Sequence, residues 1–171
     1  DAAGGAVTTG TLNTLIGGLA GDVLTTGAGN VALGTSALSA DTLGSLSTAI
    51  GYQALESQNF TTATSTYNTA VGINAGNQVT TGVQNTFVGG LAGDGTDDGY
   101  NNTAVGYLAL SANAGNDNTA VGRSALLVCT GSDNTALGKD AGSSLTSGSN
   151  CLVLGHDAGI TGSPGGNLTS G

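Results

Sequence analysis

The chain has 171 residues, of which 8% are charged and 32 are glycine, and its formal net charge is −9. Its two basic residues, Arg123 and Lys139, cannot form the positive surface that nucleic-acid phosphates or anionic lipid head groups require. No apolar run reaches the roughly 18 residues of a membrane span. We therefore expect no nucleic acid among its partners and no membrane insertion.

One pattern, N-T-A-V-G-x-x-A followed by G or L, recurs along the whole chain. An Ile, Val or Leu precedes each glycine of the pattern, and an alanine follows it by three residues. The glycines are spaced by 16 or 17 residues, with one spacing of 21, and are Gly17, Gly34, Gly51, Gly72, Gly89, Gly106, Gly122, Gly138 and Gly155.

A fixed period below about 20 residues is too short for a helix pair but suits one turn of a β-solenoid. We therefore predict an all-β fold, a parallel β-solenoid or β-roll with one coil per repeat of 16–17 residues. Residues 1–171 then form a single array of nine to ten coils. Near the end, residues 168–171 match residues 145–148 letter for letter, so we expect the array to be an excerpt of a longer fibre.

The residue four positions after each repeat glycine follows a longer rhythm. In chain order it reads G-L-L-G, G-L-L-G and G, from Gly21 to Gly159. Residues 16–22 and 88–94 are nearly identical and lie 72 residues apart, which corresponds to four coils. This pattern indicates growth by duplication of four-coil blocks.

An asparagine stands near the start of nearly every repeat. We expect this column to stack at one corner of the solenoid, where side-chain amides hydrogen-bond along the axis. The glycine column should mark a bend with no room for a Cβ atom. The column comprises Asn13, Asn30, Asn68, Asn85, Asn102, Asn118, Asn134 and Asn150, with Ser47 as the exception.

Two connections differ from the others. Residues 56–67 hold the extra residues of the longest repeat, including Phe60 and Tyr67. These two aromatics and Tyr100 are candidates for binding a host-surface receptor or glycan, although packing within loops explains them equally well. Tyr52 and Tyr107 follow repeat glycines and should lie on the outer surface.

The connection at residues 94–100 carries Asp94, Asp97 and Asp98. Their carboxylates could supply oxygen ligands to Ca²⁺, although the spacing lacks the final Glu of an EF-hand loop. A solvated acidic turn is the simpler interpretation. We expect no other cofactor.

Catalysis is not expected. A triad needs a base beside a nucleophile, but the one histidine, His156, occupies the repeat position of Arg123 and Lys139 and should be exposed. Val71-Gly72-x-x-Ala75 fits one unit of the hexapeptide acyltransferases, whose fold needs three units per coil. Cys129 and Cys151 could form a disulfide between neighbouring coils or remain two buried thiols.

The alternation within a strand predicts self-association. Neighbouring residues point to opposite faces, so Val71 shares one face with Thr69, while Ala70 lies on the other with Gly72. We expect the Val71 and Val105 column to fill the core of the coil. The small alanine face would then meet another subunit about a symmetry axis.

The N-T-A-V-G-x-x-A pattern is similar to the repeats of bacteriophage tail fibres, especially those of marine phages and cyanophages. It resembles more loosely the N-S-V-A-I-G repeats of trimeric autotransporter adhesin heads. The match covers nearly the whole chain, and only residues 150–155 share the adhesin motif's length.

The resemblance implies a homotrimeric, left-handed β-roll in a fibre outside the cell or on the virion surface. We expect a non-catalytic segment of a tail fibre or surface adhesin that supports attachment to a host. The alternative is a subunit of a self-polymerising extracellular filament, in which copies join end to end.

Overall fold

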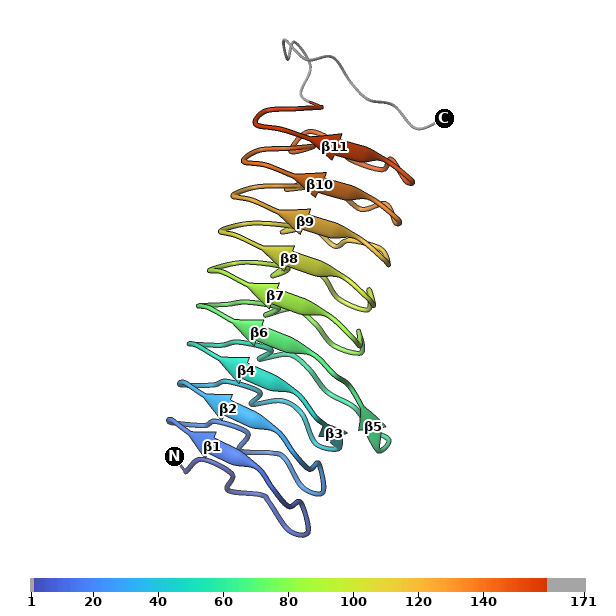
Figure 1. Ribbon diagram of the computed structural model, residues 1–171. Coiled ribbons are helices and arrows are strands. Elements are labelled where there is room, and N and C mark those ends of the chain that lie inside the picture. Colours follow the sequence, from blue (N-terminus) through green and yellow to red (C-terminus); the bar gives the residue numbers. More distant parts are fainter. Residues whose placement is uncertain (1, 160–171) are drawn as a thin grey trace.

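The computed structural model describes residues 2–159, which form a parallel β-solenoid of short strands stacked as a rod (Figure 1). The predicted fold class and the assignment of one coil to each repeat are confirmed. The expected repeat at residues 168–171 lies outside the described part of the chain. Within residues 2–159, no helix is long and apolar enough to cross a membrane.

A nine-stranded sheet runs along the rod and takes one strand from each repeat. A second sheet of two strands, β3 and β5, lies beside its N-terminal half (Figure 1). The strands are β1 (Thr14–Ile16), β2 (Val31–Leu33), β3 (Gly44–Ser45), β4 (Thr48–Ile50), β5 (Thr64–Ser65), β6 (Thr69–Val71), β7 (Thr86–Val88), β8 (Thr103–Val105), β9 (Thr119–Val121), β10 (Thr135–Leu137) and β11 (Leu152–Leu154).

The strands pair without any shift, so each position of the repeat forms a straight column. Thr69 of β6 is opposite Thr86 of β7, and Val71 is opposite Val88. The repeat glycine forms the bend after each strand. Gly72 has a φ of 143°, and a Cβ atom there would lie 2.4 Å from the carbonyl oxygen of Gly89. The bend therefore excludes any side chain, as predicted.

The asparagine column is buried and links successive coils. Asn85 Oδ1 accepts a 2.9 Å hydrogen bond from the backbone N–H of Asn102, and its Nδ2 donates one of 2.8 Å to the carbonyl of Gly99. Stacking along the axis is confirmed, although these bonds run mainly to the backbone. The last member was assigned wrongly, because the backbone N–H of Cys151, rather than that of Asn150, bonds to Asn134 Oδ1.

The predicted direction of the strand faces is wrong. Ala70 and Ala104 have no exposed surface, whereas Val71 and Val105, on the opposite face of the sheet, are only partly buried. The coil is so narrow that its two walls meet through alanine, because Ala75 is also fully buried. Neighbouring residues of a strand point to opposite faces of the sheet. Since the alanine column fills the core, the aliphatic column next to it lies outside.

The four-coil rhythm arises from matching side-chain sizes in the core. Phe87, which replaces the strand alanine, is fully buried. A Cβ atom at Gly76 would lie 2.9 Å from its ring, and one at Gly93 would lie 2.4 Å from it. A large residue in the middle of a strand thus lies between two of the glycines found four positions after a repeat glycine. Coils with leucine in place of that glycine have alanine in the middle of the strand. The same arrangement holds for Leu15 between Gly4 and Gly21, and for Val153 between Gly142 and Gly159.

A buried polar network fills the coil in which Ser47 replaces asparagine. The Gln58 side chain donates to Asp41 Oδ2 at 2.6 Å and to Ser47 Oγ at 2.9 Å, and it accepts from Asn68 Nδ2 at 2.9 Å. Asp41 Oδ1 also accepts the backbone N–H of Phe60 at 3.1 Å. This network compensates for the missing amide and anchors the long connection inside the coil.

Candidate interaction surface

The face of the nine-stranded sheet opposite the alanine core carries two straight columns of side chains. We call this surface the outer face. The first column follows the asparagines and is mostly threonine, with Val31 and Leu152 as exceptions. The second column precedes the repeat glycines and is aliphatic in every coil. Its nine members are Ile16, Leu33, Ile50, Val71, Val88, Val105, Val121, Leu137 and Leu154.

The aliphatic column is accessible to solvent over the whole length of the rod. Ile16 is 56% exposed, Val88 in the middle is 37% exposed, and Leu154 at the far end is 50% exposed. The threonines present a methyl group and a hydroxyl beside this column. Neither column contains a charged residue.

The column directly after the repeat glycines changes character along the rod. Tyr52 and Tyr107 are about half exposed, at 50% and 52%, as predicted. The Tyr107 ring lies over the preceding coil, because a Cβ atom at Gly90 would be in ordinary van der Waals contact with it at 3.6 Å. The same column continues with the basic side chains of the C-terminal coils.

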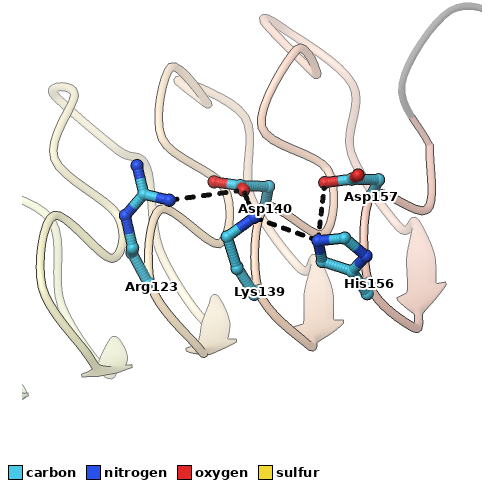
Figure 2. A network of polar contacts seen from close by, with 5 residues as sticks. All are labelled: Arg123, Lys139, Asp140, His156 and Asp157. Carbon is cyan, nitrogen blue, oxygen red and sulfur yellow. Dashed lines mark hydrogen bonds and ion pairs between the residues drawn. The ribbon is translucent and has the colours of Figure 1, made fainter.

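Those basic side chains form a polar network across three coils (Figure 2). Lys139 Nζ lies 2.7 Å from Asp140 Oδ2 and 3.0 Å from His156 Nε2. Arg123 reaches the same aspartate at 3.6 Å, and His156 Nε2 lies 3.3 Å from Asp157 Oδ1. A hydrogen bond from Lys139 is the main reason that the pKa of Asp140 is lowered.

This network has the wrong composition for a catalytic triad. His156 is exposed, as predicted, and its partners are a lysine and an aspartate instead of a hydroxyl or thiol. Oxygen and nitrogen atoms of Asp140, His156 and Asp157 lie within 4.8 Å of one another, close enough for a metal ion. The Lys139 ammonium already contacts the first two of these groups, so a second cation there would be repelled.

The aspartates of the 94–100 connection are partly engaged by hydroxyl groups. Ser111 Oγ donates a 2.5 Å hydrogen bond to Asp94 Oδ1, and Thr80 Oγ1 donates to Asp97 Oδ1. Burial is the main cause that raises the pKa of Asp94. Asp98 is exposed. Within residues 2–159, the three side chains whose possible metal-ligand atoms converge are Asp140, His156 and Asp157, and this group does not include the aspartates of the 94–100 connection. Ca²⁺ binding at this connection therefore stays a prediction.

The candidate aromatic residues do not share one environment. Phe60 is 7% exposed and packs inside the long coil, so the packing interpretation holds for it and its listing as a surface-binding candidate is wrong. Its backbone anchors to Asp41, which the sequence pattern did not reveal. Tyr67 and Tyr100 are 57% and 42% exposed, and they remain accessible for a ligand.

Both cysteines are free thiols. Cys129 is fully buried, and burial is the main cause that raises the pKa of its thiol. Asn134 Nδ2 lies 3.4 Å from its sulfur. Cys151 is partly buried in the asparagine column, so the simpler of the two expectations, two thiols, describes this structure.

The chain matches no protein-family model, and no curated protein or solved structure is significantly similar to it. Its function must therefore be argued from the fold and from the outer face.

Proposed function

We propose that the chain is a non-catalytic structural segment of a fibre, either a bacteriophage tail fibre or a bacterial surface adhesin, that supports attachment to a host. The observation that carries the proposal is the uninterrupted stack of nine strands in one register. At about 4.8 Å per coil, the stack alone spans about 38 Å. An extended rod of this kind suits the separation of a binding tip from a particle or cell.

The hydrogen bonding between coils supports a structural role. Each coil contacts only its neighbours, so a fibre can lengthen by adding coils without changing its core. The buried asparagines add bonds along the axis in most coils; for example, the backbone N–H of Asn85 donates a 2.9 Å hydrogen bond to Asn68 Oδ1. The long connection with Tyr67 leaves the pairing of β4 and β6 intact. Loops can therefore vary on a constant shaft.

The working unit in this proposal is a homotrimer located outside the cell or on the virion surface. Tyr67 and Tyr100 are the residues on which we would first test binding to a host glycan or receptor, because both are exposed. The similarity of the repeat to trimeric fibre repeats favours three copies. The alanine face no longer supports this number, because it is internal to each coil.

Immunogold labelling tests the proposed function directly. Antibodies raised against the chain should label thin fibres that project from virions or cells in the sample that yields the gene. Label confined to the cell interior would contradict the proposal. Binding of the purified chain to host cells, compared with a Tyr67→Ala and Tyr100→Ala variant, would then separate a passive shaft from a receptor-binding segment.

A self-polymerising filament is the second candidate, favoured by the open edge of the sheet. Within the described residues, β1 pairs with β2 alone and β11 pairs with β10 alone. Unpaired strand edges are templates for further pairing. Electron microscopy of the purified chain distinguishes the candidates, because filaments that lengthen with concentration and time support polymerisation, whereas rods of one fixed length support the fibre segment.

A further inference from the structure

The outer face presents an unbroken aliphatic column along the length of the rod. Its aliphatic column continues through all nine strands, with Leu33 at 43% and Leu137 at 54% exposure. Nine strands of three residues cover a strip of about 38 Å by about 10 Å, or roughly 400 Å² in projection. The largest apolar patch of a typical monomer covers about 300–600 Å² and is often functional, so a strip of this size is a candidate interaction surface.

The regular spacing of the face restricts the kind of partner. Side chains repeat at every coil, about 4.8 Å apart, without a break at any coil. A globular partner would match only part of such a strip. A second copy of this chain has the same spacing and, when parallel, places an aliphatic side chain level with each aliphatic column member over the full length.

Charge and size also favour a second copy. The chain carries a net charge of −9, but the two columns of the outer face hold no charged residue. Copies that meet there keep their carboxylates out of the contact, where like charges would oppose association. The strip supplies about half of the roughly 800 Å² that each partner buries in a standard interface. The uneven side-chain surface and flanking columns, such as that of Tyr107, add further area.

The side chains of the aliphatic column vary in a way that packing tolerates. The column accepts Val, Leu and Ile at different coils, as in Val88, Leu137 and Ile16. Exchange among aliphatic side chains preserves an apolar contact when neighbours can repack. A ligand that required one fixed side-chain shape would not accept this variation.

We propose that the outer face is the surface through which copies of this chain associate side by side, about an axis parallel to the solenoid. This inference rests on the proposed function and identifies the face that the assembly buries. It replaces the alanine face predicted from the sequence. Since the alanine core lies within each coil, separated copies keep that core and should remain folded.

Paired charge substitutions on matched valines test this inference. The test variant is Val88→Lys with Val105→Lys on the outer face. The control is Val23→Lys with Val128→Lys, because these valines are 37% and 39% exposed, close to Val88 at 37% and above the partly buried Val105, but lie outside the sheet. Sedimentation velocity should show oligomers for the wild type and the control, and single chains for the test variant, with unchanged far-ultraviolet circular dichroism.

A milder variant keeps the test decisive if lysine disrupts folding. Val71→Thr, Val88→Thr and Val105→Thr preserve the side-chain shape and remove apolar surface, so the dissociation constant should rise at least tenfold. Oligomers of unchanged affinity in both outer-face variants would overturn the inference and leave the fibre proposal standing. A wild-type chain that stays single would overturn both this inference and the proposed assembly.

Discussion

Replacing Phe87 by alanine removes the largest side chain in the core of the solenoid. The ring is fully buried, and it fills the space beside Gly76 and Gly93. Truncation of a buried phenylalanine costs about 3–5 kcal/mol through lost apolar burial and the cavity left behind. The backbone of this coil is fixed by the coils on both sides, so little collapse can reduce the cavity.

Leucines at Gly76 and Gly93 should restore much of that loss. Leu38 and Leu55 occupy the same position of the repeat on either side of Ala49, with φ values of 54° and 49°. The left-handed conformation costs a leucine about 1–2 kcal/mol per site, partly offset by the smaller entropy of the unfolded chain. The triple variant Phe87→Ala, Gly76→Leu, Gly93→Leu should therefore recover more than half of the stability lost in Phe87→Ala.

Urea unfolding followed by circular dichroism measures this coupling, with all variants at one protein concentration. The two leucines with Phe87 retained form the control, and they should destabilise the fold because a Cβ atom at Gly93 already lies 2.4 Å from the ring. The reasoning is refuted if the triple variant is no more stable than Phe87→Ala. It is also refuted if the control is as stable as the wild type.

Three further variants test other parts of the structure. Asn85→Ala should lower the free energy of unfolding by about 2–4 kcal/mol, because it leaves one buried N–H and one buried carbonyl without partners. Urea unfolding measures this loss. The control Asn59→Ala, at an exposed position, should change the free energy of unfolding by less than about 0.5 kcal/mol. Asp94→Asn should stabilise the protein at neutral pH, because the pKa of Asp94 is raised by burial and its charged form is disfavoured in the fold. When urea unfolding is repeated at decreasing pH, this advantage should disappear as the pH falls through the raised pKa to below 3.8, since Asp94 is then neutral. A stability advantage of Asp94→Asn that persists at low pH would contradict burial of the charge as its cause. Asp140→Ala should alter thermal stability little, because its partners Arg123 and Lys139 have side chains that are 56% and 49% exposed, and a large loss would mean that the network of Figure 2 is structural.

Periodicity was sufficient to predict the architecture. The unbroken aliphatic and alanine columns predicted the parallel solenoid, its coil length and the stacked asparagines, because identical coils in register place identical residues above one another. Periodicity could not decide which strand face is internal, since alternation in a strand treats both faces alike. The sizes of the partners could have decided it, because Phe87 occurs only where glycines stand at the facing position.

The places of individual residues were harder to predict than the architecture. The sequence left Phe60 either exposed for binding or packed, and it is buried because the long connection folds inward, where Gln58 and the Phe60 backbone both bond to Asp41. Asn150 was placed in the ladder by residue type, whereas the count back from Gly155 assigns that position to Cys151. Local identity misled in both cases, and the position within the coil was the better guide.

The mass of the unmodified chain in solution tests the central claim most directly, namely that copies of this solenoid associate side by side into a fibre. Sedimentation equilibrium over a range of micromolar concentrations should give the mass of three chains. The mass of a single folded chain throughout that range would contradict the account.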